Sequence, residues 1–432
     1  MKPTPVIAVF DVGKTNKKLF LFDEGYNIVF ERSARFNEIT DEDGFPCENL
    51  DSLELSVYDS LKEIGKLKEF ELKVVNFSAY GASFVYLDEN GQAIAPLYNY
   101  LKPYPEDLND QFYNNYGGKE KISFQTASPA LGSLNSGLQL YRIKYQKPEL
   151  FKKIKYALHL PQYLSWLVSG QMFSDLTSIG CHTALWDFER NDYHEWVTME
   201  GIADKLPPIH ASDAVVRSSI PGSNYQVGVG LHDSSAALIP YLVSFKEPFI
   251  LLSTGTWAIS LNPFNQSSLT QDELQHDCLN YIQYSGKPVK ASRLFSGHEY
   301  EEGVKRIAEK FGQDVLKYRN IPFEAGKVGI SAEDAEDADI KAYYQLIAEI
   351  VDQQKKSTGY VLKGTGVKRM FVDGGFSKNS VFMHMLAAAF PGLEVYAASM
   401  AQATALGTAL AVHRHWNTSP IPNDIIQLKY YS

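Results

Sequence analysis

Short apolar runs separated by polar turns mark the start of the chain. Residues 6–10 form one such run, residues 18–23 form another, and the polar segment DVGKTNKK lies between them. Runs of this length, bounded by turn residues, predict two strands joined by a polar turn. Residues 50–69 then carry apolar positions at helical spacing, and LKVVNFSAYGASFVYLD supplies two further strand candidates.

The same kinds of pattern return later in the chain. Around residues 136–170 the pattern is helical, and a second strand–turn–strand unit follows at FILLSTGTWAISL, residues 249–261. MFVDGGFSKNSVFMHMLAAAF predicts a strand, a glycine turn and an amphipathic helix, and AQATALGTALAVH predicts a helix of small residues suited to close packing. A strand–turn–strand with a polar tip therefore occurs twice. We expect two similar α/β domains, residues 1–243 and 244–432, facing each other across a cleft.

Composition narrows the class of protein. A chain of 432 residues exceeds what one core usually organises, which agrees with two domains. The net charge of −10 argues against a nucleic-acid partner, although backbone amides can still bind a small anion. The three cysteines lie far apart and predict reduced thiols. No segment resembles a signal peptide or a membrane span, so we expect a cytoplasmic protein without a membrane partner.

The segment from Asp11 to Lys18 has the residues of a phosphate-binding turn. A glycine at the bend lets backbone N–H groups and Thr and Asn side chains converge on one spot. Asp11, at the strand end, can hold Mg²⁺ through water. A plain surface hairpin is equally consistent with this segment alone. The letters GKT do not form a P-loop, because that motif requires glycine where the chain has Ala8.

Three further segments carry polar turns. Ser253–Trp257 places hydroxyls and amides at a glycine turn, which suits phosphate oxygens, although such residues are common in any turn. Asp233 follows His232 in a glycine-flanked turn, which fits a general base that accepts a hydroxyl proton. The alternative for Asp233 is the cap of a helix that begins at Ser234. The Gly-Gly pair after Asp373 permits close approach to a ribose or a flat ring, or is simply a tight strand-to-helix turn.

Taken together and in this order, these segments resemble the FGGY family of carbohydrate kinases. The resemblance extends from AVFDVGKTNKK through FSAYGASFVYLDENG, GVGLHDSSAAL, FILLSTGTWAISL and DGGFSKN to AQATALGTAL. It implies two ribonuclease-H-like domains of the actin-like ATPase superfamily, flanking an ATP and sugar cleft. The first domain would carry the sugar site, the first phosphate loop and the catalytic Asp, and the second would bind the nucleotide.

The resemblance also implies roles for single residues. Asp233 falls at the catalytic base, Asp11 lies near Mg²⁺, and Gly81, His232 and Ser234 lie at the sugar beside Asp233. The residues implied in ATP binding are Gly13, Lys14, Thr15, Asn16, Lys17, Lys18, Gly255, Thr256, Gly374 and Gly375.

Within the family, three segments look most like L-rhamnulokinase and L-fuculokinase. These are the His-Asp pair, STGTW and YGASFVYLD. This branch implies phosphorylation of the C1 hydroxyl of a 6-deoxy-ketohexose. The chain departs from the family pattern at Lys14, at Ala82 and Ser83 in place of Val-Asp, and in SGLQLYRIKY, which lacks the family Lys and Trp. Xylulose, ribulose or a polyol is therefore the alternative substrate.

The expected chemistry is direct phosphoryl transfer from MgATP to a sugar hydroxyl, with the sugar and ATP as small-molecule partners and a homodimer as a candidate assembly. Two other functions use the same scaffold. One is a nucleotide-dependent regulator or chaperone, since one fold hosts many functions. The other is a catalytically silent sugar sensor. A base at the sugar-facing position favours the kinase.

Overall fold

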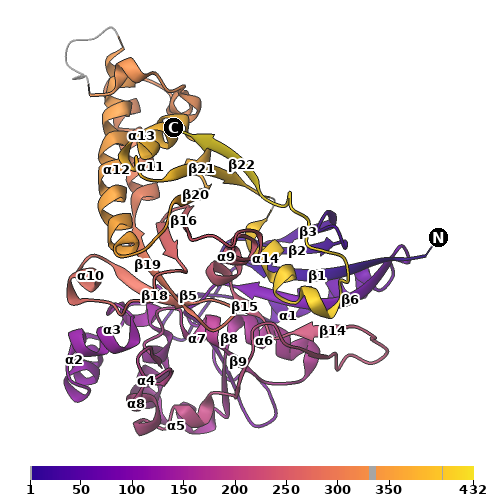
Figure 1. Ribbon diagram of the computed structural model, residues 1–432. Coiled ribbons are helices and arrows are strands. Elements are labelled where there is room, and N and C mark those ends of the chain that lie inside the picture. Colours follow the sequence, from indigo (N-terminus) through magenta and orange to yellow (C-terminus); the bar gives the residue numbers. More distant parts are fainter. Residues whose placement is uncertain (1, 330–336, 401) are drawn as a thin grey trace. The chain divides into compact units, whose positions relative to one another are not determined.

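The computed structural model describes residues 2–329, 337–400 and 402–432, and its chain groups into two compact units (Figure 1). The first unit comprises Met1–Val243, Asn280–Pro288 and Ala401–Ile425. The second unit comprises Ser244–Leu279, Val289–Met400 and Ile426–Ser432. One long segment therefore ends at Val243, and two later segments pack with it rather than with the residues around them in sequence.

The first unit is built on a seven-stranded mixed sheet in the order β13-β14-β6-β1-β2-β3, with β15 also paired to β6. β1, β2 and β3 form an antiparallel meander, and β6 runs parallel to β1. The strands are β1 (Thr4–Val12), β2 (Lys17–Phe22), β3 (Ile28–Ala34), β6 (Phe70–Ala79), β13 (Val215–Arg217), β14 (Gln226–Gly228) and β15 (Leu231–His232). The helices that accompany this sheet are α1 (Leu50–Ile64), α6 (Leu160–Ser169), α9 (Asp233–Ser244) and α14 (Ala403–Ala411).

The chain between β6 and β13 forms a series of short elements, and most of them contribute to a second cluster of buried residues in the first unit. These elements are β7 (Phe84–Leu87), α2 (Glu106–Asn115), α3 (Lys119–Thr126), α4 (Ser136–Gln146), α5 (Pro148–Lys153), β8 (Tyr156–His159), β9 (Ser174–Asp175), α7 (Leu176–Ile179), β10 (Trp186–Asp187), β11 (Asp192–Tyr193), α8 (Glu195–Met199) and β12 (Ile209–His210). The helical pattern predicted around 136–170 is confirmed for α4 and α6, but strand β8 interrupts it.

The second unit repeats the plan of the first. Its sheet has the order β18-β19-β17-β16-β20-β21-β22; β17 pairs antiparallel with both β16 and β19, and β20 runs parallel to β16. The strands are β16 (Phe249–Thr254), β17 (Ala258–Asn262), β18 (Cys278–Ile282), β19 (Pro288–Leu294), β20 (Arg369–Gly374), β21 (Glu394–Ser399) and β22 (Gln427–Tyr431). Residues 280–282 of β18 and residue 288 of β19 group with the first unit. The helices are α10 (Gln271–Gln275), α11 (Ser296–Phe311), α12 (Ala338–Leu362) and α13 (Ser380–Ala389). Three antiparallel strands continued by parallel neighbours occur in both sheets, which confirms the predicted ribonuclease-H-like fold class.

Local sequence explains the elements that position the site. Residues Val6–Val9 of β1 are fully buried, as expected for a central strand with an apolar run. Asn49 caps α1 by accepting the backbone N–H of Ser52 (3.0 Å). The small residues of α14 allow close packing, because a Cβ at Gly407 would lie 1.9 Å from the carbonyl oxygen of Ala236 in α9.

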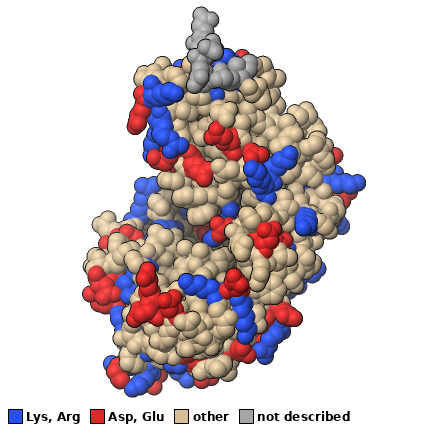
Figure 2. Space-filling view, turned by 90° about the vertical axis from the view of Figure 1, so that its left-hand side faces the viewer, with Lys and Arg blue, Asp and Glu red and all other residues tan. Residues whose placement is uncertain are grey.

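The surface carries charges of both signs. On the face drawn in Figure 2, Lys and Arg side chains are interspersed with Asp and Glu side chains. Among the described residues, no helix has the length and apolar character that crossing a bilayer requires.

Candidate active site

Three strand ends adjoin at one edge of the first sheet. β1 and β6 are parallel neighbours with Asp11 opposite Ser78, and β15 is parallel to β6 with Leu231 opposite the same Ser78. The carboxyl ends of parallel strands lie at one edge of a sheet, which is where ligands bind in open α/β folds. Asp11, Gly81 and Asp233 therefore lie at or just after three adjoining strand ends, although they are far apart in the sequence.

Two carboxyl groups at this edge carry charge that the protein compensates only in part. The pKa of Asp11 is raised to about 6, first by burial and then by the negative charge of Asp233, while a hydrogen bond from Ser78 and the charge of Lys18 oppose the rise. Burial also raises the pKa of Asp233 to about 6, against hydrogen bonds from Ser234. The backbone N–H of Ser234 donates to Asp233 Oδ1 (2.6 Å), and Ser78 Oγ donates to Asp11 Oδ1 (3.0 Å). Such a pair is suited to accept a proton or to bind a cation.

The hairpin between β1 and β2 forms the tight turn that the sequence predicts. The Gly13 N–H donates to the Asn16 carbonyl (2.9 Å), which closes the turn. The Lys17 ammonium is buried, lies 2.9 Å from the Glu48 carboxylate and donates to the Lys14 carbonyl (3.0 Å). Lys17 therefore anchors the hairpin through an ion pair, and its side chain is already engaged.

The other polar residues of this hairpin are more exposed. Lys14 Nζ lies 3.0 Å from Glu38, and Lys18 Nζ lies 3.5 Å from Glu31. Thr15 and Asn16 are exposed at the tip of the turn. The tip thus presents a backbone turn with polar side chains, whereas the lysines have carboxylate partners within the same unit.

His232 is buried against the turn that follows β6. A Cβ at Gly81 would lie 2.9 Å from the imidazole ring, so only glycine permits this approach. Nε2 of His232 lies 3.2 Å from Oδ1 of Asp233 and 3.2 Å from Sγ of Cys181, and the ring stacks on Tyr281 with centroids 6.0 Å apart. Burial lowers the pKa of His232 to about 4, so the ring is neutral near pH 7.

A hydrogen-bond chain supports His232 from outside the predicted site residues. The backbone N–H of His232 donates to Thr177 Oγ1 (3.0 Å), and that hydroxyl in turn donates to the carboxylate of Asp175. Ser212 also donates to Asp175, which is fully buried and caps the short helix α7. The only sequence signal here is an Asp before a short helical stretch. It predicts a cap, and it does not predict the contact between Thr177 and His232, which are 55 positions apart.

In the second unit, the hairpin β16–β17 and the glycine turn after β20 border one cavity of about 390 Å³. Gly255, Thr256 and Gly375, all predicted to bind the nucleotide, line it. Gly374, also predicted to bind the nucleotide, is not among the lining residues; its φ is +87°, and a Cβ there would meet the Thr254 carbonyl oxygen at 1.8 Å. The remaining lining residues, which no sequence pattern predicted, are Gly297, Tyr300, Glu301, Arg319, Phe376, Lys378 and Asn379.

Contacts between segments build this cavity, so local sequence patterns predict only three of its ten lining residues. A Cβ at Gly297 would lie 1.9 Å from the Gly255 carbonyl oxygen, so the start of α11 packs directly on the hairpin. The Phe376 N–H donates to Thr254 Oγ1 (3.0 Å), which joins the glycine turn to the same hairpin. Tyr300 and Glu301 belong to α11, whose sequence shows an amphipathic helix and no motif.

Few side chains in the described part of the chain could bind a metal ion. No cluster of three or more His, Cys, Asp or Glu side chains suited to a metal ion occurs among residues 2–329, 337–400 and 402–432. Asp11 and Asp233 are the acidic groups at the strand edge. Mg²⁺ keeps much of its hydration shell and needs only one or two protein carboxylates when phosphates supply other oxygens, so this donor set is compatible with it.

The doubled sheet plan and the glycine-lined cavity define a two-domain fold of the actin-like ATPase class. Residues 6–239 match the N-terminal domain of the FGGY family of carbohydrate kinases, and residues 246–321 and 338–416 match its C-terminal domain. The chain belongs to this family. It is therefore an enzyme, a carbohydrate kinase that transfers phosphoryl groups from ATP, and the predicted family and enzyme class are confirmed.

Solved structures share the fold over nearly the whole chain. A carbohydrate kinase from Novosphingobium aromaticivorans is similar with a TM-score of 0.81 and 23% identity, covering 99% of this chain and 94% of that one. A xylulose kinase from Lactobacillus acidophilus has a TM-score of 0.81, 15% identity and coverage of 99% and 93%. The glycerol kinase of Plasmodium falciparum, solved with ADP, has a TM-score of 0.74, 17% identity and coverage of 96% and 90%.

Proposed function

We propose that this carbohydrate kinase phosphorylates a ketose and that Asp233 is its general base. The observation that carries the proposal is the environment of Asp233 at the carboxyl ends of β1, β6 and β15. Burial raises the pKa of Asp233 to about 6, which is close to the pKa that suits a base working near neutral pH. A third of its side chain is exposed, so a hydroxyl can reach it.

In the proposed reaction, Asp233 accepts the proton of the sugar hydroxyl while that oxygen attacks the γ-phosphorus of ATP. The new O–P bond forms as the bond from the γ-phosphorus to the bridging oxygen breaks, and ADP leaves with the electron pair. Phosphoryl transfer depends mainly on positioning and charge stabilisation. Mg²⁺ would neutralise phosphate charge, and Asp11 is the residue that would hold it through water.

The nucleotide is proposed to occupy the cavity of the second unit, where Gly255 and Thr256 offer a phosphate turn and Gly374 and Gly375 allow close backbone approach. In the first unit, the turn from Gly13 to Asn16 is proposed as the first phosphate loop. Lys17 is proposed to act there only by anchoring the turn, because its ammonium is engaged by Glu48.

The sugar is proposed to bind beside Gly81, His232 and Ser234. Nε2 of the neutral His232 ring lies 3.2 Å from the Asp233 carboxylate. The ring therefore carries its single proton on Nε2, where it can donate to that carboxylate. Nδ1 is then an acceptor, and it is buried without a hydrogen-bond partner among the described residues. A sugar hydroxyl that donates to Nδ1 would satisfy it and would align the substrate next to Asp233.

The proposed acceptor is the C1 hydroxyl of a 6-deoxy-ketohexose, L-rhamnulose or L-fuculose. Support comes from the resemblance of the His-Asp pair, STGTW and YGASFVYLD to that branch. Similar structures described as xylulose, gluconate and glycerol kinases support the alternative, another ketose or a polyol. The functional domains 1–243 and 244–432, a cytoplasmic location and a homodimer belong to the same proposal.

An ADP-release assay tests the proposal with MgATP and a panel of L-rhamnulose, L-fuculose, D-xylulose, L-ribulose, D-fructose and glycerol. Turnover with one 6-deoxy-ketose supports the proposed branch. Turnover only with another sugar retains the kinase and moves the substrate to the alternative. If every sugar leaves ADP release at the level of Asp233→Ala while ATP still binds, the chain is a sensor or a switch.

A further inference from the structure

A second small cavity lies in the first unit, next to α4. It is lined by Tyr98, Asn99, Lys102, Ser133, Gln139, Arg142, Ile143, Gln146 and Lys147. Two of the contributing segments are PLYNYLKPYPE, rich in tyrosine, and SGLQLYRIKY, where the chain lacks the family Lys and Trp. None of Asp11, Gly81, His232 and Asp233 lines this cavity, so it is distinct from the candidate active site.

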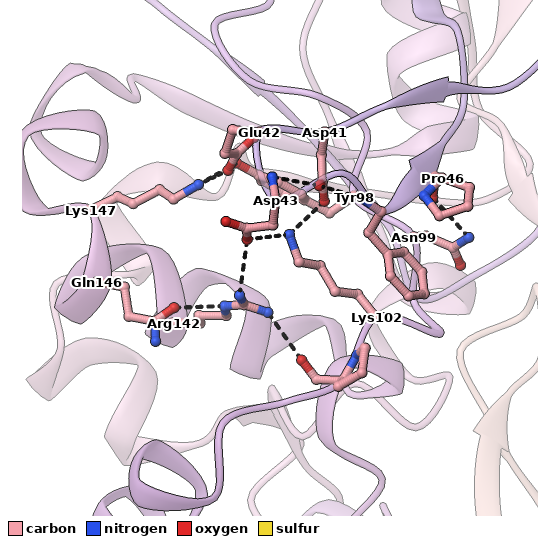
Figure 3. A network of polar contacts seen from close by, with 12 residues as sticks. Asp41, Glu42, Asp43, Pro46, Tyr98, Asn99, Lys102, Arg142, Gln146 and Lys147 are labelled. Atoms are coloured by element: carbon pink, nitrogen blue, oxygen red, sulfur yellow. Dashed lines mark hydrogen bonds and ion pairs between the residues drawn. The ribbon is translucent and has the colours of Figure 1, made fainter.

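Cations line the cavity, and their partner acids lie outside its lining. Lys102 Nζ lies 2.5 Å from Asp41 and 2.6 Å from Asp43, and Figure 3 shows Arg142 directed to the same Asp43 carboxylate. Lys147 pairs with Glu42. Because the acids of residues 41–43 are not among the lining residues, the charged side chains that line the cavity are all cationic.

Two of these cations, the buried Lys102 and the partly exposed Arg142, retain hydrogen-bond donors for a ligand. Lysine has three N–H bonds, and Lys102 directs two to Asp41 and Asp43 within the described part of the chain. Arginine has five, and Arg142 directs three to Gln146, Pro103 and Asp43 in the same ranges. Lys102 is 8% exposed, so this is a buried donor site rather than a surface lysine.

Gln139 offers a hydrogen-bond acceptor, whereas Lys102 and Arg142 offer donors. It is 5% exposed, and its Nε2 donates to the carbonyl oxygens of Ala82 and Ser133, each at 2.6 Å. Two carbonyl partners fix which end of the amide is the nitrogen. Its Oε1 is buried and has no hydrogen-bond partner among the described residues. A ligand that fills this cavity should therefore accept from cations and donate one O–H to Gln139.

The volume restricts the ligand further. The space open to the centre of a water molecule is about 30 Å³. One water needs about 10–15 Å³ on that measure, so the cavity holds roughly two waters or one compact tetrahedral oxyanion. A five- or six-carbon sugar is too large.

We infer that this cavity is an accessory site for inorganic phosphate. Monohydrogen phosphate has oxygens that accept from Lys102 and Arg142 and one hydroxyl that donates to Gln139 Oε1. Sulfate has the same shape and charge as this dianion but no hydroxyl to donate. The site should therefore prefer phosphate to sulfate, because only phosphate can donate this hydrogen bond.

Titration calorimetry of the full chain, without nucleotide or sugar and in a buffer free of other oxyanions, tests the inference at a pH where both ions are dianions. Wild type is expected to bind phosphate about three- to tenfold more tightly than sulfate, which is the size of one net hydrogen bond. Gln139→Met is expected to lose this preference and bind both ions alike.

Arg142→Met tests the cationic wall, and Lys144→Met is its matched control. Lys144 lies on the same helix but pairs with Glu200, and it does not line the cavity. Arg142→Met is expected to weaken phosphate binding roughly tenfold, as for loss of a charge-assisted hydrogen bond, while Lys144→Met leaves it unchanged.

Three results would overturn the inference. The first is equal affinity of wild type for phosphate and sulfate, which needs no variant and so does not depend on how variants fold. The second is phosphate binding that Arg142→Met and Lys144→Met affect equally. The third is phosphate binding that saturating ADP abolishes and Arg142→Met spares, which assigns the ion to the nucleotide cavity. Because no turnover is measured, failure here is separate from failure of the proposed function.

Discussion

The first unit holds two groups of carboxylates whose pKa values are shifted in opposite directions. At the strand edge, burial raises the pKa of both Asp11 and Asp233 to about 6. In the charge cluster of Figure 3, burial also acts to raise the pKa of Asp41, but hydrogen bonds from Lys102 and from backbone N–H groups lower it overall. Asp41 is fully buried and has a lysine partner, whereas Asp11 and the one-third-exposed Asp233 form no ion pair with Lys or Arg among the described residues.

The difference separates function from stability. A buried acid with its own lysine keeps its charge in the folded state and contributes to the fold. A buried acid without a lysine partner destabilises the folded state when it is charged. A proton from the substrate or a bound cation removes that destabilisation. We therefore expect Asp11 and Asp233 to act on ligands and Asp41 to stabilise the fold. Substitutions at each place test these roles.

Removing the proposed base should have the largest effect. Asp233→Ala is expected to lower kcat by about 10²–10⁴-fold, because general-base catalysis is lost while the binding residues remain. ADP release with the best sugar of the panel measures it, and nucleotide binding checks that the protein is folded. Asp43→Ala is the control, since its half-exposed carboxylate belongs to the charge cluster. A kcat of Asp233→Ala within a few-fold of the control contradicts the assignment.

Removing the fixed cation should destabilise the fold. Lys102→Met leaves the fully buried Asp41 carboxylate without its ion-pair partner, and breaking such a pair costs about 3–5 kcal/mol of unfolding free energy. Lys73→Met is the control, because Lys73 and Glu71 form an exposed pair that contributes at most about 1 kcal/mol. Urea unfolding near neutral pH compares the two variants.

The pH dependence of that loss has a defined sign. The pKa of Asp41 is lowered in the fold, so its contribution is present above the unfolded pKa and is lost as pH falls through the folded pKa. The gap between wild type and Lys102→Met should therefore narrow in acid. A gap that is no larger than for Lys73→Met, or one that widens in acid, would show that Asp41 is not stabilised by its cation.

Local sequence predicted the elements better than it predicted their contacts. The strand at residues 6–10 and the helix from residue 50 are confirmed because apolar spacing and an N-cap are properties of one segment. The helix predicted to continue to residue 69 ends at Ile64, and Phe70 already begins β6. Pairing with β1 from Phe70 onward favours an extended chain over another helical turn.

The same limit applies to the site. Asp233 and Gly255 lie in turns whose glycines and polar residues are visible in sequence, so both could be identified as candidates. The buried ion pair of Lys17 could not be predicted in this way, because its partner Glu48 is 31 residues away and no local pattern indicates the contact. Arg319 and Thr177 were missed for the same reason, since a tertiary contact gives each its place.

The support behind His232 predicts a smaller effect. Thr177→Val removes the acceptor of the His232 backbone N–H, and an unsatisfied buried N–H costs about 1–3 kcal/mol. If that cost displaces His232 from the sugar, KM should rise by roughly tenfold with kcat little changed, which is about 1.4 kcal/mol. Thr177→Ser keeps the hydroxyl and should restore KM. Equal KM values in the Val and Ser variants would show that Thr177 does not position His232.

The smallest effect tests the strand-edge acids by stability. The pKa of Asp233 is raised from 3.8 to about 6 in the fold, so the folded state binds the extra proton and loses stability as pH rises through that range. Asp233→Asn removes the charge and should therefore be more stable than wild type above pH 6 by on the order of 1 kcal/mol, since the exposed third of the side chain screens part of the penalty. The advantage should vanish below pH 3.8, where the Asp233 carboxyl is protonated in both the folded and the unfolded state. Urea unfolding without nucleotide or Mg²⁺ measures both values. An Asn variant that is less stable than wild type at neutral pH would mean that the Asp233 charge is compensated within the fold, and the contrast with Asp41 would then fail.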